Sequence, residues 1–535
     1  MHVAPVASTF FSTLFIHHKY INIMFFSSLF KKTKAEAESF DTVNYEGAGA
    51  FALTPEMELY TAVVTCALSD KFYEAASDQV NRIFDLTTKV SPEFVAKLAV
   101  YTRTQMQLRS VPLFLAVALA KVHRGDDLVA RTVEKVVLRA DEIMELLACY
   151  QVLNPSTGVK KLGKLSHQIQ EGLRRAFNRF DEYQFAKYNR RGIPVTLRDA
   201  LFLVHPKAKD EAQQALFDKI VSGTLSVPYT WETELSALGE RDFASNKERA
   251  KAFRQKWEEL VGSGKMGYMA TLRNLRNMLQ AGVGNDTVKR VCSYLADERN
   301  VMASKQLPFR FFSAYRELEN AFGNHASAVL EALDNAMKAS AANIAGFNAD
   351  TRALIACDVS GSMYAPVSRN SSVRCFDVGL VLGMLLRSRL SNAITGMFGD
   401  TWKAYNLPKG RILRAVSEME RHEGEVGYST NGFEVLKWMR ANDVVVDKVM
   451  FFTDCQMWDS TNTHDTFARE WSHYKRLHPK AEMYIFDLVG YGQAPLRVEQ
   501  NGVYLIGGWS DRIFDIVDAI RCGVSAIDVI SAIEL

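Results

Sequence analysis

The stretch Asp358-Val359-Ser360-Gly361-Ser362 follows directly on the apolar run Ala353-Leu354-Ile355-Ala356-Cys357, and it narrows the fold more than any other junction in the chain. An apolar run that ends in polar residues is typical of a buried parallel strand opening into a loop. Open α/β sheets bind ligands in the loops at the carboxyl ends of such strands. An aspartate with two hydroxyls at alternate positions offers only hard oxygen atoms, which suit Mg²⁺, Mn²⁺ or Ca²⁺ and not Zn²⁺ or copper.

Two later segments carry oxygen ligands to the same region. The run 445–452 indicates a second buried strand, and Thr453 and Asp454 follow it. Between the two strands, the glycine-flanked turn 427–432 contains Thr430 and opens onto an amphipathic helix. Five side chains can therefore meet at one sheet edge: Asp358, Ser360, Ser362, Thr430 and Asp454.

This set resembles the metal-ion-dependent adhesion site of von Willebrand factor A domains. The resemblance implies that two serines and a threonine hold the ion, and that the acids act directly or through water. Mg²⁺ is the cation that best fits a shallow surface site, because it keeps waters readily. We expect an open position on the ion that attracts an acidic side chain of a protein partner.

Two other interpretations of the aspartate loop remain open. A helix N-cap cluster would explain one serine, since serine and aspartate favour that position, but not three separated loops. A phosphoryl-accepting aspartate would need a second aspartate two residues on as its acid–base partner, and that position is Ser360. The chain shows no other catalytic constellation, so we expect that it is not an enzyme.

Length and composition indicate a globular protein of at least two domains. The 535 residues exceed what one core supports, and 48% of them are hydrophobic. Seven scattered cysteines without a C-x-x-C motif indicate structural thiols in a reducing compartment, hence a cytoplasmic protein without a zinc site. No segment reaches the roughly 20 apolar residues of a membrane helix, and residues 1–23 are expected to be an over-extended start or a disordered tail.

The periodicity divides the chain into three parts. Residues 1–40 form an N-terminal extension. Residues 41–349 have a helical periodicity, with short helices that suggest a repeat array; helix starts are expected at Thr54-Pro55-Glu56 and Ser91-Pro92-Glu93. An irregular helical bundle is the alternative. In residues 350–535, strands alternate with helices, which indicates a doubly wound α/β domain with strands at 353–357, 393–398, 445–452, 482–489 and 503–506.

Positive charge is concentrated in the helical part. The segment 160–209 holds twelve basic and four acidic residues, which favours a polyanion such as RNA, although a solvated face is the plainer explanation. Pro206 cannot continue a helix, so His205 and Lys207 are expected on a loop at a helix end. The stretch 265–279 is expected to be a helix with Arg273 and Arg276 beside an apolar stripe.

These features together resemble the Ro ribonucleoprotein family, whose members carry a TROVE module followed by a von Willebrand A domain. The resemblance rests on Glu46-Gly47-Ala48, Leu197-Arg198-Asp199-Ala200-Leu201, His205-Pro206-Lys207, Leu307-Pro308-Phe309-Arg310-Phe311, the helix 266–279 and the stretch 358–363. It implies a ring of HEAT-like helical repeats, with the A domain helping to close it.

The resemblance also implies RNA quality control as a scaffold or chaperone. Small noncoding Y-like RNA would bind the outer surface, and single-stranded ends of misfolded RNA would enter the central hole. The residues implied are Lys187, Arg190, Arg191, Arg198, His205, Lys207, Arg273 and Arg276, and the RNA can tether an exoribonuclease. The competing hypothesis is a metal-dependent protein-interaction module without an RNA role.

Overall fold

The computed structural model describes residues 40–66, 71, 74–154, 164–189, 192–319, 325–341, 344, 347, 350–368, 371–407, 410–458 and 466–535. It separates a unit that ends at Phe40 from a compact unit spanning Asp41–Leu535. The expectation for residues 1–23 lies outside the described residues.

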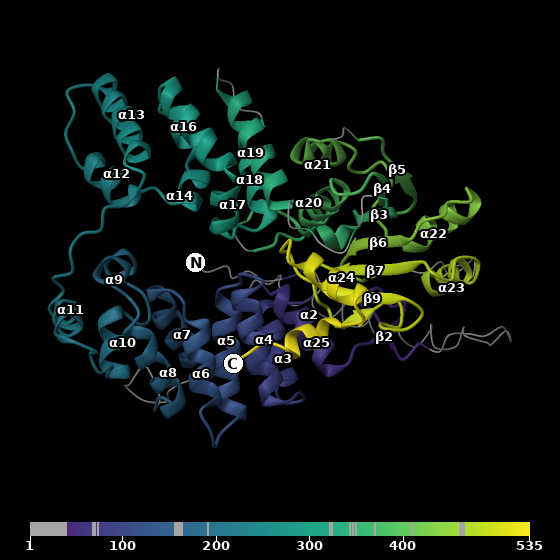
Figure 1. Ribbon diagram of the computed structural model, residues 1–535, viewed down its shortest axis with the longest axis horizontal. Helices are drawn as coiled ribbons and strands as arrows, with labels where there is room; N and C mark the ends of the chain where they lie inside the picture. The colour runs from purple at the N-terminus through teal and green to yellow at the C-terminus, as the bar shows by residue number, and fades with distance from the viewer. Residues whose placement is uncertain are drawn as a thin grey trace, which may run out of the picture. The chain divides into compact units, whose positions relative to one another are not determined.

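Helices follow one another through the first part of this unit (Figure 1). They are α2 (Pro55–Val64), α3 (Ala76–Thr87), α4 (Pro92–Thr104), α5 (Ser110–Val122), α6 (Leu128–Val136), α7 (Ala140–Leu153), α8 (His167–Phe177), α9 (Glu182–Tyr188), α10 (Leu197–Val204), α11 (Glu211–Ser222), α12 (Trp231–Gly239), α13 (Asn246–Gly262), α14 (Tyr268–Arg273), α15 (Leu275–Gln280), α16 (Asn285–Ala296), α17 (Glu298–Ser304), α18 (Pro308–Glu319) and α19 (Ala326–Ala341).

Local sequence sets where these helices begin. Thr54 and Ser91 each precede a proline at the first helical position, and each hydroxyl accepts a hydrogen bond from the backbone N–H three residues on. Each cap satisfies a backbone donor that the helix itself leaves unpaired. Helices near in sequence pack together, as in α4 with α5, α5 with α7 and α18 with α19. The predicted all-helical repeat array is thus confirmed.

A six-stranded sheet forms the second part. Its strands are β3 (Arg352–Asp358), β4 (Asn392–Phe398), β5 (Trp402–Ala404), β6 (Lys448–Thr453), β7 (Glu482–Asp487) and β9 (Val503–Gly507), in the order β5-β4-β3-β6-β7-β9. All neighbours pair in parallel except the edge strand β5, which is antiparallel to β4. The predicted doubly wound α/β fold is confirmed, and the second expected strand begins at Lys448 and not at residue 445.

The helices of this part are α20 (Cys375–Arg387), α21 (Ile412–Arg421), α22 (Gly432–Ala441), α23 (Phe467–Leu477), α24 (Ile513–Arg521) and α25 (Ala526–Ser531), with the 3₁₀ turn η1 (Gly361–Tyr364). Helix α20 packs on β3 and β6, α22 on β4 and β5, and α24 on β9. After β3 the chain builds β4 on one side and then returns to build β6 on the other. The carboxyl ends of β3 and β6 therefore form the topological switch point, where open α/β sheets bind ligands.

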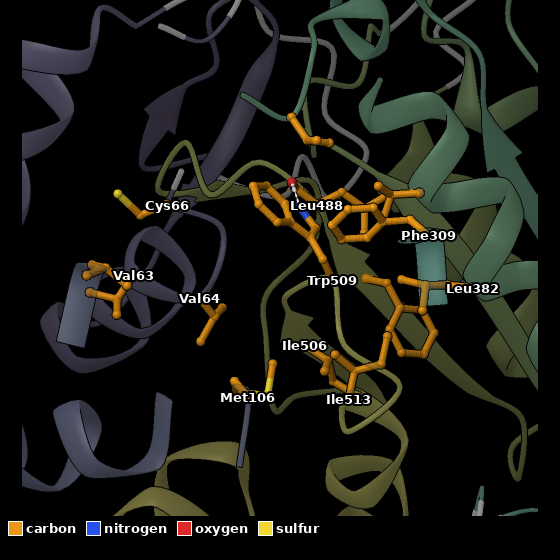
Figure 2. Packing of buried hydrophobic residues seen from close by; sticks show 14 of the residues in the cluster. Val63, Val64, Cys66, Met106, Phe309, Leu382, Leu488, Ile506, Trp509 and Ile513 are labelled. Atoms are coloured by element: carbon orange, nitrogen blue, oxygen red, sulfur yellow. Dashed lines mark hydrogen bonds between the residues drawn. The ribbon is translucent and has the colours of Figure 1, made fainter. Parts of the chain in front are cut away.

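The two parts share one hydrophobic core. Figure 2 shows Val64 of α2 on one side of the loop after β9, and Phe309 of α18 on the other. The rings of Phe309 and Trp509 meet edge to face at 6.4 Å, and the Trp509 indole donates to the Leu488 carbonyl at 2.7 Å. A Cβ on Gly507 would lie 2.7 Å from a methyl of Val64, so only glycine permits this close approach. Both ends of the helical array thus contact the α/β part.

A small antiparallel sheet adds a second connection between the two parts. It consists of β1 (Thr42–Val43), β2 (Gly49–Ala52) and β8 (Gln493–Ala494), in the order β1-β2-β8. Phe51 and Ala52 pair with Ala494 and Gln493. These strands are too short to show alternation of apolar and polar residues, and for that reason the sequence did not reveal them.

Candidate metal centre and nucleic-acid interface

The five expected ligands of the cation do converge. Asp358 ends β3, Ser360 precedes η1, and Ser362 lies within η1. Thr430 precedes α22, and Asp454 follows β6. All five are buried, with exposed fractions of 5% or less. The hydroxyl oxygens of Ser360 and Ser362 lie 3.3 Å apart.

Backbone hydrogen bonds hold the three loops against each other. The Gly361 N–H donates to the Tyr428 carbonyl at 3.0 Å, which joins the serine loop to the threonine loop. The Trp458 N–H donates to the Thr430 carbonyl at 2.9 Å, which joins the threonine loop to the segment after β6. The donor set is therefore assembled by the fold itself.

Among the residues that the structure describes, no cationic side chain forms an ion pair with either carboxyl group. Asp358 accepts from the Ser360 N–H at 2.8 Å and from the Thr453 hydroxyl at 2.5 Å. Burial raises the pKa of Asp358, and burial together with the Asp358 carboxylate raises the pKa of Asp454 still further. Asp454 Oδ2 is buried without a hydrogen-bond partner in the described part of the chain.

These observations fit a hard divalent cation. A buried carboxylate oxygen without a donor is costly unless something positive occupies the space that it faces. The oxygen-only donor set matches the preference of Mg²⁺ and excludes the thiolates and imidazoles that zinc prefers. No cluster of three or more His, Cys, Asp or Glu suited to a metal occurs among the described residues, so the hydroxyls would have to serve as ligands.

Three residues of this site were not identified from the sequence. Thr453 binds the Asp358 carboxylate, as described above, and Asp400 accepts from the Ser429 N–H at 2.8 Å, which shapes the threonine loop. Gln456 donates its N–H to Asp454 Oδ1 at 3.0 Å. Thr453 directly precedes Asp454 and could have been chosen on that ground. Asp400 and Gln456 carried no sequence signal.

Part of the basic segment does form an exposed surface. His205 caps α10 in the left-handed conformation, with φ of 49°, and its N–H donates to the Leu201 carbonyl at 2.9 Å. His205 and Lys207 are both exposed, as expected for a loop at a helix end. Arg198 is also exposed and lies over the ring of Phe202, whose exposed fraction is 50%. Arg190 and Arg191 lie outside the described residues.

Other arginines of this segment are engaged within the fold. Arg174 donates to the Val204 carbonyl at 3.0 Å, and Arg175 forms an ion pair with Glu134 at 3.0 Å. Arg179 donates to the carbonyls of Glu134 and Val137. Much of the charge excess in the sequence thus joins helices to each other, and the accessible basic surface is narrower than the composition indicates.

A cavity of about 1200 Å³ lies among the helices of the array. Residues from α7, α9, α14, α15 and α18 line it, together with the segments 229–232 and 265–267. Lys187, Arg273 and Arg276 all contribute to this lining, whereas Arg198, His205 and Lys207 are not part of it. The structure thus groups Lys187 with the two arginines of the later helices, and not with the turn at His205.

The cavity mixes cations with aromatic rings. Tyr183, Tyr188, Tyr229 and Trp231 line it beside the basic groups. The Lys187 ammonium lies 5.8 Å from the ring centre of Tyr183 and 5.6 Å from that of Tyr188. Lys265 lies 5.1 Å from the ring centre of Tyr229.

Acidic neighbours neutralise only some of these cations. Arg276 pairs with Glu317 at 3.1 Å, and Arg109 and Arg139 both pair with Asp141. Within the described ranges, four lining cations form no ion pair: Lys187, Lys265, Arg273 and Arg310. Burial and the charge of Arg273 together lower the pKa of Arg310, so the cavity wall carries uncompensated positive charge.

The stretch expected as one helix over 266–279 is two short helices, α14 and α15. Asn274 separates them with φ of −103° and ψ of 8°, and its side chain donates to the Ala270 carbonyl at 2.9 Å. Such a bond competes with the helical backbone ladder and favours a break. Asn274 is buried, while Arg273 and Arg276 are exposed on either side of it.

Comparison with known proteins places these features in a family. The model of the TROVE domain matches residues 69–256 and 223–367. Telomerase protein component 1 of Rattus norvegicus and of Mus musculus are each 24% identical over 345 residues, which is 49% of this chain and 13% of either relative. The chain thus spans a small part of these relatives.

A solved structure also shares the fold. The crystal structure of the Deinococcus radiodurans Ro (RSR) protein superposes with a TM-score of 0.56 at 17% identity, covering 87% of this chain and 100% of that one. None of the helices that the structure describes is both long and apolar enough to cross a membrane.

Proposed function

The chain belongs to the family of TROVE-domain, Ro-like proteins, and we propose that it is an RNA-binding component of a ribonucleoprotein that acts as a scaffold or chaperone in RNA quality control. It has no catalytic role in this proposal. The seven cysteines are all free, in keeping with a cytoplasmic place of action.

The cavity is the observation that carries the proposal. Four cations that have no acidic partner among the described residues face a space of about 1200 Å³, together with several aromatic rings. Cations attract the phosphate backbone, and tyrosine rings stack on unpaired bases. We therefore assign the cavity to single-stranded ends of misfolded RNA, bound by Lys187, Arg273 and Arg310, with Arg276 contributing less because Glu317 balances its charge.

The exposed surface at α10 suits a different RNA. Arg198, His205 and Lys207 lie outside the cavity lining. A structured small noncoding RNA of the Y type is too bulky for the cavity, and would bind here mainly through its phosphates. A bound RNA of this kind could tether an exoribonuclease that degrades strands held in the cavity.

A competition assay tests whether the chain has two RNA sites. Labelled single-stranded RNA is bound to the protein, and an unlabelled structured small RNA is added in excess. The single strand should stay bound, because the two RNAs occupy different surfaces. Complete displacement at stoichiometric amounts of structured RNA would contradict separate sites.

The metal site supports a second, compatible function. Asp358, Ser360, Ser362 and Thr430 would hold Mg²⁺, with Mn²⁺ or Ca²⁺ as substitutes, and Asp454 would bind directly or through water. The ion would supply an open coordination position for a carboxylate of an acidic protein partner. Tyr428 and Trp458 favour this function, since both flank Thr430 and are 52% and 38% exposed.

A further inference from the structure

The segment 42–52, here called the N-terminal hairpin, contacts the loop 454–458 that carries Asp454. The Asn44 side-chain amide donates to the Met457 carbonyl at 2.6 Å. The Tyr45 N–H donates to the side-chain oxygen of Gln456 at 2.8 Å. Asn44 is 7% exposed and Gln456 is fully buried, so water does not replace either bond readily.

Gln456 also contacts the candidate metal ligand Asp454. Its backbone N–H binds Asp454 Oδ1 at 3.0 Å, and its side-chain amide donates to the Asp454 carbonyl at 3.3 Å. Asp454 is thus held on one oxygen while Oδ2 remains without a hydrogen-bond partner in the described part of the chain. That is the arrangement expected of a carboxylate oriented for a cation.

Cys455, which lies between Asp454 and Gln456, has a backbone conformation that its neighbours must stabilise. Cys455 has φ of 64°, a conformation that non-glycine residues adopt at a cost and keep only when their neighbours fix it. Its N–H donates to the Thr453 hydroxyl at 3.2 Å, and that hydroxyl in turn binds Asp358. Hydrogen bonds, together with the backbone of residues 453–457, therefore connect the N-terminal hairpin to both acids of the site.

We propose that the N-terminal hairpin is a positioning element of the metal site, in which Asn44 and Gln456 fix the loop so that Asp454 faces the cation. The proposal rests on the metal site proposed above. Residues that orient a metal ligand typically contribute about 10–100-fold to metal affinity. Because binding couplings are reciprocal, the bound cation should also stabilise the hairpin. A partner that pulled the hairpin away would release the ion.

The hairpin offers a selective variant and a matched control. Asn44 Oδ1 accepts from the N–H groups of Glu46 and Ala48, so Asn44→Asp keeps both acceptor bonds of the turn, while it replaces the donor to Met457 with a charged oxygen that repels the Met457 carbonyl. Asp41 supports the same hairpin by accepting from the Ala52 N–H and pairing with Arg497. Asp41→Asn keeps the first of these contacts and does not touch the loop 454–458.

The first test is calorimetric titration of the full chain with Mg²⁺, using wild type, Asn44→Asp, Asp41→Asn and Asp358→Ala. We expect Asn44→Asp to weaken Mg²⁺ binding by about tenfold, Asp41→Asn to match wild type, and Asp358→Ala to abolish binding. If Asn44→Asp and wild type bind Mg²⁺ with equal affinity while Asp358→Ala does not bind it, the positioning role is overturned and the metal site is not. Unchanged binding by Asp358→Ala overturns the metal site itself.

Hydrogen exchange separates positioning from a purely structural tether. Mg²⁺ should slow exchange of the Tyr45 amide in wild type and in Asp41→Asn, and have no such effect in Asn44→Asp. A tether without coupling would give the same exchange rate with and without Mg²⁺ in wild type, and that result overturns the proposal.

Discussion

At the scale of single residues, the two candidate sites treat charge in opposite ways. In the described part of the chain, the candidate metal site buries Asp358 and Asp454 without a cationic partner, and the cavity presents Arg273 and Arg310 without an acidic one. Each arrangement is unfavourable by itself, and each becomes favourable when a ligand of opposite charge arrives. The residue types are evident from the sequence, but the neutralisation of Arg276 by Glu317 joins residues 41 positions apart on different helices and could not be predicted.

The first prediction concerns pH and the metal. The raised pKa of Asp454 means that the folded, metal-free protein binds a proton more tightly than the unfolded chain does. The contribution of Asp454 to stability without metal should therefore be fully present below the ordinary aspartate pKa of about 4 and be lost as pH rises through the folded value. Mg²⁺ competes with that proton, so its stabilising effect should grow with pH.

Thermal unfolding at pH 6 and pH 8, with chelator or with Mg²⁺, measures this effect. Compared with wild type, Asp454→Asn should show a weaker dependence of metal-free stability on pH and a smaller stabilisation by Mg²⁺. The prediction would be contradicted if Mg²⁺ raised the unfolding temperature of the wild-type protein more at pH 6 than at pH 8.

The second prediction separates the two RNA surfaces by single charge reversals. Lys187→Glu should weaken binding of single-stranded RNA, because Lys187 lines the cavity, and should spare structured RNA. Lys207→Glu, on the exposed turn, should do the reverse. Each lost contact should reduce the slope of log affinity against log salt by about 0.7 for single strands and 0.9 for duplex. Filter binding at several salt concentrations measures both, and equal effects of the two variants on one RNA would contradict the assignment.

At the scale of elements, helix starts and helix ends could be predicted from the sequence where a single residue determines the local backbone geometry. The caps at Thr54 and Ser91 and the turn at Pro206 follow from rules that involve a few neighbouring residues. The five long strands were found because buried parallel strands are continuously apolar. The break at Asn274 was missed because the same side chain is compatible with a helix, and its hydrogen bond to Ala270 decides the outcome only in the packed structure.

The third prediction concerns the packing of α2 against β9. Gly507→Ala should destabilise the protein by about 1–3 kcal/mol, because the new methyl would overlap Val64. The double variant Gly507→Ala with Val64→Ala should be less destabilised than the sum of the two single variants, since removing the Val64 methyls relieves the contact. Chemical denaturation measures each value, and strict additivity would show that the two side chains do not meet.

At the scale of the whole molecule, the helical array and the α/β part are joined at both ends of the array and through the β1-β2-β8 sheet. The fold class could be predicted because the pattern of apolar residues distinguishes a run of helices from an alternation of strands and helices, and each pattern is typical of one layer architecture. The grouping of Lys187 with Arg273 and Arg276 could not, because it depends on how distant helices face a common cavity. The convergence of Asp358 and Asp454 was predictable, since the carboxyl ends of parallel strands in one sheet meet at one edge.

The central claim is that the chain binds RNA through uncompensated cations of the cavity, independently of the metal. The most direct measurement is the Kd of a labelled single-stranded RNA for wild type, Arg273→Glu/Arg310→Glu and Asp358→Ala, with Mg²⁺ or with chelator, over a range of salt. We predict that the double charge reversal weakens binding by at least about tenfold and flattens the salt dependence by about 1.4 units. Asp358→Ala and chelation should leave the Kd unchanged. Tight binding by the double variant, together with loss of binding on chelation, would contradict the account.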